Sequence, residues 1–339
     1  MMVSNGYFSN QQSHFTEKIT RLTVWNSAYN EDMDMIRNAS DVKLQYSIDG
    51  ATTLTFTTLR SYSYNYIPNS GDLVTMDFAG KRVFTGRVFV RELSDDVKWA
   101  ITAYDNMRYL KGTGTIVWGA TTSSQRLKTI AETLGLPYEI RHSSLTAAPA
   151  EVSDGVTFFD MLSKAIEYAN HDGKFVIYAD EYGKLIHEDA SYLDYGLLIG
   201  DRNGAIDFTF KADIEDLYNQ VTVTNEDSET KQRTSKTASD YESMDKYGPL
   251  FMTENADSNT NSSQMLDKAK SLLNEKNKEK ISFSLSAIGD MRFRAGTIFY
   301  VDMYATNAIG VGQNRRVFAT QVTHTFDKGH TMEIEVDLL

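Results

Sequence analysis

Hydrophobic and polar positions alternate with a period of two over two long parts of the chain. Residues 74–78 read apolar, polar, apolar, polar, apolar, and a turn at 79–82 leads into a returning strand over 83–91. Such alternation indicates strands with one buried face. Residues 19–111 are therefore expected to form an antiparallel β-domain of meander or barrel type, which follows a polar arm over residues 1–18.

The hydrophobic period becomes helical after this first β-domain. A capping box at Thr122 and Gln125 opens one helix, and Thr157 opens a second helix. A hairpin with a polar turn at 180–183 follows the second helix. Residues 112–205 are therefore expected to form a small α+β module.

Strand-like alternation returns in the last third of the chain. Residues 331–338 alternate without a break, with one face of Met332, Ile334, Val336 and Leu338 and an opposite face of Thr331, Glu333, Glu335 and Asp337. We expect a second antiparallel β-domain over 206–339, with a helix at 262–279. The polar stretch 226–260 is expected to be a long loop or an exposed hairpin. The predicted class is α+β, mainly β, with two barrel-like β-domains and the module between them.

Composition narrows the class of protein. The chain has 339 residues, 41% of them hydrophobic, and a formal net charge of −12. It has no cysteine, which excludes disulfides, thiolate metal sites and a cysteine nucleophile. No third of the chain is net positive, which argues against binding that tracks nucleic-acid phosphates. No run of about 20 apolar residues and no signal peptide is evident, so synthesis in the cytoplasm is expected.

Residue patterns that carry chemistry are few. None of the six histidines forms a helical metal-binding pair, and no nucleophile elbow or phosphate loop is present. His324 and His330 flank a tight turn and are expected to be solvated. The acidic pairs at 180–181 and 188–189 are expected to be turn and surface residues rather than a glycosidase pair. We therefore expect no catalytic residue, no metal ligand and no cofactor.

Several segments, in their order and spacing over about residues 20–339, resemble one known family. They are Ile101 to Leu110 with Tyr104-Asp105-Asn106, the helix 122–135, Gly155-x-Thr157-x-Phe159-Asp160-x-Leu162, Gly183-Lys184-Leu185, Gly289-Asp290-Met291-Arg292-x-Arg294-Ala295-Gly296, and Val322 to Met332. The family is the XkdQ/YqbQ-like phage tail proteins, related to late-control-D hubs and to the hub part of type VI secretion spikes.

The resemblance implies a structural baseplate hub, not an enzyme, in a contractile phage tail or a prophage-derived, tail-like contractile injection system. It implies a homotrimer whose two tube-type β-domains per chain form a pseudo-sixfold ring joining the tail tube to the central spike. The implied partners are the chain itself, the tail tube protein, a spike or needle protein, a LysM-bearing tail protein and baseplate wedge proteins. The implied location is the virion tail baseplate, after synthesis in the bacterial cytoplasm. DNA, where the particle carries it, passes through the lumen without specific binding.

Two groups of residues follow from this reading. The acidic row Glu333, Glu335 and Asp337 is expected to face the lumen and to repel phosphates. The turn with Gly289, Asp290, Arg294 and Gly296 is expected to be structural, with Asp290 and Arg294 able to pair across it.

Two alternative functions stay open on the sequence alone. One is a peptidoglycan-degrading tail lysin, although no catalytic signature supports it. The other is a carbohydrate-binding tail adhesin that uses the ladder Tyr62, Tyr64 and Tyr66 as a stacking surface.

Overall fold

A computed structural model describes the chain over nine stretches. They are residues 18–26, 30–59, 66–94, 98–171, 173–226, 233–256, 260–305, 314–327 and 329–339. By compactness the chain divides into two units, residues 209–283 and the remainder. The strands β16 (Ala205–Asp213) and β20 (Lys280–Ile288) run from one unit into the other.

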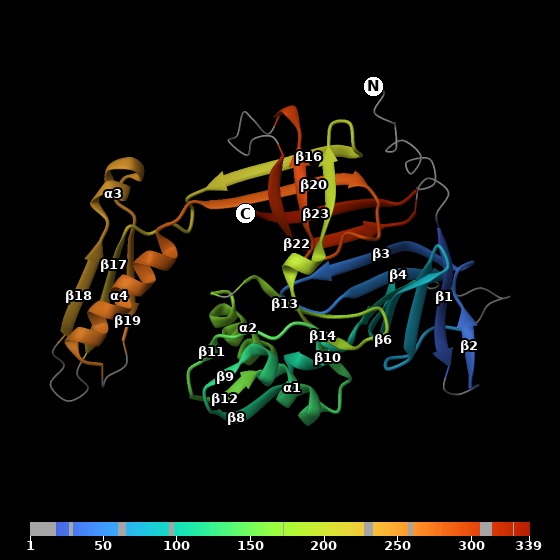
Figure 1. The fold of residues 1–339 in the computed structure, drawn as a ribbon, viewed down its shortest axis with the longest axis horizontal. Helices are drawn as coiled ribbons and strands as arrows, with labels where there is room; N and C mark the ends of the chain where they lie inside the picture. Colours follow the sequence, from blue (N-terminus) through green and yellow to red (C-terminus); the bar gives the residue numbers. More distant parts are fainter. Residues whose placement is uncertain are drawn as a thin grey trace, which may run out of the picture. The chain divides into compact units, whose positions relative to one another are not determined.

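The first β-domain is an antiparallel sheet. Its strands are β1 (Ile19–Asn26), β2 (Glu31–Asp34), β3 (Ala39–Ser47), β4 (Thr53–Leu59), β5 (Leu73–Phe78), β6 (Lys81–Ser94) and β7 (Lys98–Tyr104). Their order in the sheet is β3-β4-β7-β6-β5-β1-β2 (Figure 1). Val74, Met76 and Phe78 are buried, so the alternation that predicted β5 reflects an apolar face turned to the core.

The closing strands extend the same sheet. They are β15 (Asp194–Gly200), β21 (Ile298–Asp302), β22 (Arg315–Thr325) and β23 (Thr331–Leu338). The first part of β22 pairs with β21, and its second part pairs with β3, from Gln321 opposite Ser47 to Thr325 opposite Lys43. The two β-rich parts are therefore one continuous hydrogen-bonded sheet. β15, which precedes the predicted second β-domain, pairs with β21 in parallel. The expectation of a wholly antiparallel domain over 206–339 is wrong because β17 (Gln220–Glu226) pairs with β19 (Phe251–Asn255) in parallel.

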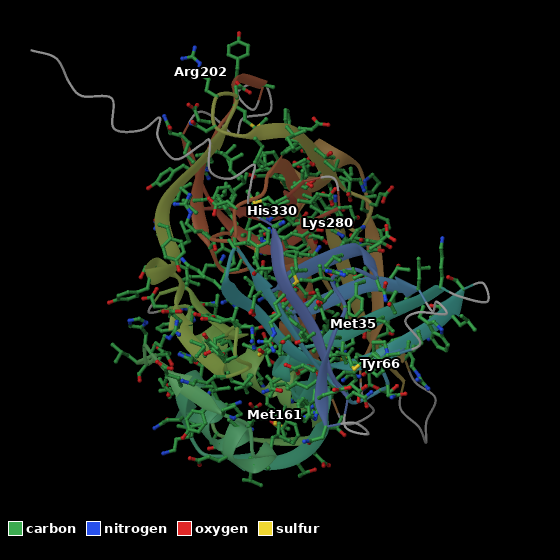
Figure 2. The ribbon with its side chains drawn as sticks, turned by 90° about the vertical axis from the view of Figure 1, so that its right-hand side faces the viewer. Met35, Tyr66, Met161, Arg202, Lys280 and His330 are labelled. Atoms are coloured by element: carbon green, nitrogen blue, oxygen red, sulfur yellow. The ribbon has the colours of Figure 1, made fainter. Side chains whose placement is uncertain are left out.

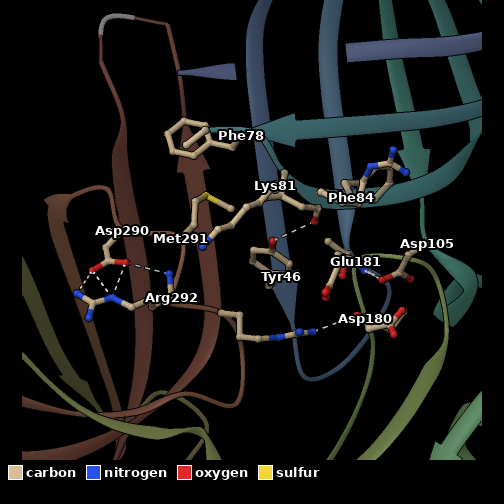
Figure 3. Close-up of a pocket in the computed structure, with 16 residues that line it drawn as sticks. Tyr46, Phe78, Lys81, Phe84, Asp105, Asp180, Glu181, Asp290, Met291 and Arg292 are labelled. Carbon is tan, nitrogen blue, oxygen red and sulfur yellow. Dashed lines mark hydrogen bonds and ion pairs between the residues drawn. The ribbon is translucent and has the colours of Figure 1, made fainter. Parts of the chain in front are cut away.

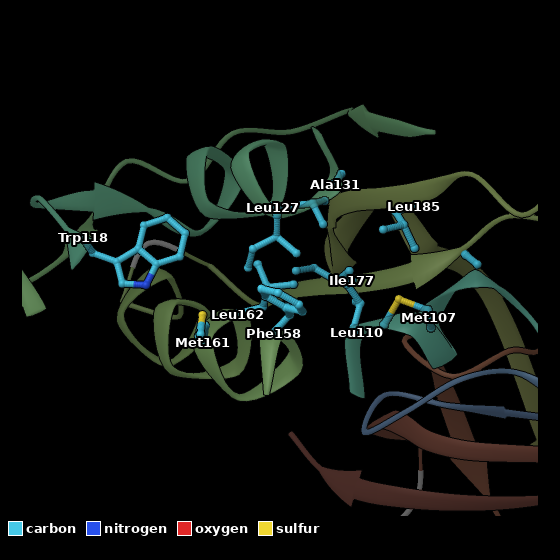
Figure 4. Packing of buried hydrophobic residues seen from close by; sticks show 12 residues of the cluster. Met107, Leu110, Trp118, Leu127, Ala131, Phe158, Met161, Leu162, Ile177 and Leu185 are labelled. Carbon is cyan, nitrogen blue, oxygen red and sulfur yellow. The ribbon is translucent and has the colours of Figure 1, made fainter. Parts of the chain in front are cut away.

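The α+β module lies between these strands in the sequence. Its elements are η2 (Asn106–Lys111), β8 (Thr113–Trp118), β9 (Thr121–Thr122), α1 (Ser123–Leu134), β10 (Tyr138–Ile140), β11 (Ala147–Ala148), β12 (Glu151–Thr157), α2 (Phe158–Ala169), β13 (Phe175–Ala179), β14 (Leu185–Asp189) and η3 (Ala190–Leu193). Leu127 of α1, Phe158 of α2 and Ile177 of β13 share one apolar core (Figure 4). The capping box at Thr122 and Gln125 is confirmed.

Residues 209–283 hold a small core of their own. The elements are β17 (Gln220–Glu226), β18 (Arg233–Ser239), α3 (Tyr241–Tyr247), β19 (Phe251–Asn255) and α4 (Ser262–Lys276). The sheet order is β18-β17-β19, and α4 packs on one face through Met265, Ala269 and Leu273. Of the two alternatives for 226–260, the long loop is wrong for the described residues 233–256, whereas β18 forms an antiparallel hairpin with β17. The predicted helix ends at Lys276, three residues early, where Asn277 caps it.

The overall class is confirmed as α+β, mainly β. Figure 2 shows Met35 among the strands of the first β-domain and Met161 within the module. In the described part of the chain, no helix is both long and apolar enough to cross a membrane.

Candidate functional site

The turn over residues 289–296 is shaped by two glycines. A Cβ at Gly289 would lie 2.2 Å from ring carbons of His330, so only glycine allows this approach. Gly296 has a φ of +94°, a conformation that side chains with a Cβ rarely adopt. The turn is thus packed against the last hairpin, as a structural motif would be.

Asp290 forms an ion pair within the turn. Its carboxylate accepts from the backbone N–H of Arg292 at 2.9 Å and takes the Arg292 guanidinium in a two-pronged ion pair. The sequence allowed Asp290 to pair with Arg294, and the structure gives Arg292 as an ion-pair partner of Asp290. The Arg292 side chain reaches the carboxylate from two positions away in the turn, and Arg294 points to the α+β module instead.

Arg294 connects the turn to the module. Its Nη2 donates to the carbonyl of Ala179 at 3.1 Å, and its guanidinium stacks 3.6 Å from the ring centre of Tyr178. The ring of Tyr46, from β3, lies 5.4 Å away. The Nε of Arg294 is buried and has no hydrogen-bond partner among the described residues. Arg294 thereby joins the second β-rich part, the module and the first β-domain.

The Asp105-Asn106 motif makes a second connection at the same place. Asp105 caps η2 by accepting from the backbone N–H of Met107 at 2.9 Å, and it also accepts from the N–H of Thr52 at 3.0 Å. Asn106 donates to the carbonyl of Gly183 at 2.6 Å. Three of the segments that carried the family resemblance therefore meet at one junction.

A cavity of about 500 Å³ opens at this junction. Its lining residues include Tyr46, Phe78 and Phe84 from the first β-domain, Asp180 and Glu181 from the module, and Asp290 to Arg292 (Figure 3). Burial raises the pKa of Asp105 to about 6, against the opposing hydrogen bonds from Thr52 and Met107. Burial also raises the pKa of Tyr46 to about 12. Both Asp105 oxygens accept backbone N–H groups, so this carboxylate caps η2 and ties it to Thr52.

The acidic pair at 188–189 is not the solvated surface that was expected. Glu188 is buried and accepts hydrogen bonds from the hydroxyl of Tyr178 and from Arg141 Nη1, the latter at 3.2 Å. Asp189 caps η3 instead. The surface expectation is wrong for Glu188 because an arginine and a tyrosine distant in sequence compensate its burial.

The acidic row Glu333, Glu335 and Asp337 lies on the exposed face of β23. Glu335 accepts from Gln321 at 3.0 Å, and Asp337 lies 3.9 Å from Lys174 of the module. On the neighbouring strands the same face carries uncharged polar residues such as Thr323, Gln45 and Thr53. That this face lines a lumen stays a prediction.

His324 is fully buried, so its expected solvation is wrong. Its Nε2 donates to the carbonyl of Phe293 at 2.9 Å, which leaves Nδ1 to accept from His330 Nε2 at 2.9 Å. Burial lowers the pKa of His324 to about 4. Among the described residues, no group of three or more metal-binding side chains could hold a metal ion.

A serine–histidine contact in the module was not detectable in the sequence. Ser123 Oγ lies 2.8 Å from His187 Nε2 and 2.8 Å from Ser144 Oγ, and His187 Nδ1 donates to the carbonyl of His142. This geometry resembles a nucleophile with its base. Ser123 and His187 are both fully buried, so the arrangement ties α1 to β14 and presents no nucleophile to solvent.

The tyrosine ladder of the adhesin alternative is described at one position only. Tyr62 and Tyr64 lie outside the described residues. Tyr66 donates from its hydroxyl to Asp72 at 2.8 Å.

The continuous sheet, the inserted module and the glycine-rich turn together define an α+β, mainly β protein. The chain belongs to the family described as YQBQ-like, which matches residues 42–337. Its membership confirms the resemblance drawn from the sequence motifs.

Known relatives are distant in sequence but similar in fold. The phage-like element PBSX protein XkdQ of Bacillus subtilis (strain 168) is 25% identical over 86% of this chain and 89% of its own length. A 43 kDa tail protein of prophage MuSo2 from Shewanella oneidensis has a TM-score of 0.66 at 13% identity, over 95% of this chain and 98% of its own. The E. coli c3393 protein, a component of the type VI secretion system described as similar to T4 tail proteins gp27 and gp5, has a TM-score of 0.51 at 10% identity over 95% of this chain and 76% of its own.

Proposed function

We propose that this protein is a non-enzymatic structural component of a phage tail or tail-like particle, in which it forms the baseplate hub. Three copies form a pseudo-sixfold ring that joins the tail tube to the central spike. The chain meets the tube protein on one side of this ring and the spike or needle on the other. LysM-bearing and wedge proteins contact its periphery.

The observation that carries the proposal is the continuous sheet. Two β-rich parts of one chain are joined through β3 and β22, and in the proposed ring each copy supplies both parts. Heterologous contacts between copies close a cyclic ring, and closure protects strand edges such as β2. Membership of the YQBQ-like family and the fold of the MuSo2 tail protein support the same assignment.

Light scattering behind size exclusion tests the ring. We expect a mass near three times 38.2 kDa for the purified chain. A chain that stays monomeric alone and also when mixed with its tube and spike neighbours would contradict the hub.

Charge reversal tests whether the acidic row lines the channel. Glu333 and Glu335 are exposed, so changing both to Lys leaves the core of β23 intact. We expect particles to assemble and to carry DNA but to deliver it more slowly. The introduced lysines attract the DNA phosphates, which the glutamates of the unaltered protein repel. Asp337 is left unchanged because of its contact with Lys174.

A matched control reverses two acidic residues of α3, Glu242 and Asp245. These changes add the same charge to α3 and leave the acidic row of β23 unaltered, and normal delivery is expected. Equal delivery by both double variants and the unaltered protein would refute a lumen role for the row.

A further inference from the structure

Within the described part of residues 209–283, one face of the small sheet has no covering element. Val221 and Val223 of β17 are buried against α4, so the alternate residues of the three strands point to the opposite side. The strand registers place nine side chains there in three rows. The rows are Ser239–Gln220–Phe251, Thr237–Thr222–Thr253 and Ser235–Thr224–Asn255, which we call the hydroxyl face.

The hydroxyl face carries no ionised group. Its nine members are four threonines, two serines, one glutamine, one asparagine and one phenylalanine, and none of them is buried. In the whole chain 24% of residues are charged. Charges of the same strands, Lys236 and Glu254, lie on the side of α4 instead. The next residue outward along β18 on this side of the sheet is Arg233, which lies beyond the nine members of the hydroxyl face.

Phe251 stands out on this face. Its side chain is 60% exposed, in the corner position beside Gln220. A single exposed aromatic ring is common on protein surfaces, and here it provides a flat apolar surface on which a sugar ring can stack. The neighbouring amide and hydroxyl groups supply donors and acceptors around that ring.

The chemistry of the hydroxyl face discriminates between classes of ligand. A nucleic-acid site requires Lys or Arg side chains that neutralise phosphates, and none of the nine residues of the hydroxyl face is Lys or Arg. A protein interface needs an apolar centre, and the hydroxyl face has one apolar residue in nine. Hydroxyls and amides in rows match a ligand that is itself a flat array of uncharged hydroxyl and amide groups. We propose that the hydroxyl face binds a neutral glycan chain, with a sugar ring stacked on Phe251.

The internal hydrogen bonds of the face leave capacity for such a ligand. Thr222 and Thr237 share one hydrogen bond between their hydroxyls at 2.9 Å, and Ser239 donates to Gln220 at 3.2 Å. A hydroxyl has one donor and two acceptor sites, so each of these groups keeps sites for a sugar hydroxyl. The hydrogen bonds also fix the side-chain positions, which lowers the entropic cost of binding. This site is separate from the junction and does not depend on the hub assignment.

Titration of the full chain with soluble oligosaccharides tests the proposal. The probes are tetramers of N-acetylglucosamine and of glucose, followed by amide NMR shifts of residues 209–283 and by calorimetry. We expect saturable shifts on β17, β18 and β19 for at least one probe. Phe251→Ala is expected to weaken binding at least about tenfold, and Thr222→Lys to do the same by placing a charge in the hydroxyl face.

Tyr241→Ala is the matched control. Tyr241 is 75% exposed but belongs to α3 and not to the hydroxyl face, so its removal should leave the affinity unchanged. Unaltered melting of the variants shows that folding is intact. Absence of shifts with both probes overturns the proposal, as does equal binding by Phe251→Ala. A third result would also overturn the proposal: Thr222→Lys lowers the mass of the assembled protein in solution, while neither oligosaccharide shifts any amide signal. The hydroxyl face would then be a protein contact.

Discussion

Gly289 lies against the imidazole of His330, and the turn over residues 289–296 can pack this closely only because glycine has no Cβ. A Cβ there would meet the ring at 2.2 Å, and the Gly289 N–H also donates to the carbonyl of His330. Gly289→Ala is expected to destabilise the chain by about 1–3 kcal/mol, because the turn or the last hairpin must shift. Urea unfolding measures this loss.

Gly119→Ala provides the comparison for that measurement. A Cβ at Gly119 would have no atom within 4 Å, and its φ is not positive, so the change is expected to be neutral within about 0.5 kcal/mol. Equal effects of the two substitutions would show that the approach of Gly289 to His330 is not close.

His324 gives the fold a dependence on pH. Its pKa is about 4 in the folded chain and 6.5 ordinarily, so between these values the unfolded chain binds more protons. The stability owed to neutral His324 is present above 6.5 and is lost as the pH falls toward 4. The maximal loss is about 3 kcal/mol. Asp105, with its raised pKa, acts oppositely, since its contribution is lost as the pH rises from 3.8 through about 6.

His324→Gln separates the two groups, because glutamine keeps an N–H donor for Phe293 but does not titrate. We expect the variant to lose less stability than the unaltered protein between about pH 7 and about pH 5. Denaturant midpoints at several pH values give the comparison. Parallel pH profiles for both proteins would mean that His324 does not titrate differently in the two states.

At the scale of elements, Arg126 of α1 holds the module together. It is fully buried, pairs with Glu151 of β12 at 2.7 Å and lies 4.8 Å from the ring centre of Trp118. It also donates to the carbonyl of Met161 in α2 at 3.3 Å and to that of Pro149 at 3.3 Å. Arg126→Ala is expected to cost about 3–5 kcal/mol, because a fully buried side chain is lost, two carbonyls lose their donor and Glu151 keeps only the partner at its exposed side.

Lys164 pairs with the same carboxylate from the surface and serves as the control. Its side chain is 53% exposed, so Lys164→Ala is expected to cost under about 1 kcal/mol. Chemical unfolding of both variants measures the difference. A similar cost for the two would show that burial of Arg126 contributes nothing extra.

The elements also show what the sequence pattern detects. Helix starts at Thr122 and Thr157 and the strand 331–338 were predictable, because caps and alternation are local signals. The strand β18 was missed because its inner face consists of Thr234, Lys236 and Ala238, so no apolar period marks it. At the junction, the motifs were visible but the partners of Arg294 and Glu188 were not, since these contacts join segments distant in sequence.

At the scale of the whole molecule, the division into two units predicts two unfolding events. Met265 lies in the core of residues 209–283, and Met76 lies in the core of the first β-domain; both are buried. Met265→Ala is expected to lower the stability of one transition by about 2–5 kcal/mol, and Met76→Ala that of the other. Hydrogen exchange by residue range reports each event. Loss of protection in both units from either substitution would show one cooperative unit.

The pairing of β22 with both β21 and β3 has a mechanical consequence. Five consecutive residue pairs connect β22 to β3, so one β-rich part cannot twist against the other without breaking backbone hydrogen bonds. A torque applied at β21 is transmitted to the first β-domain through the peptide chain of a single strand. We therefore expect the two β-rich parts to move together as one rigid body and not independently of one another.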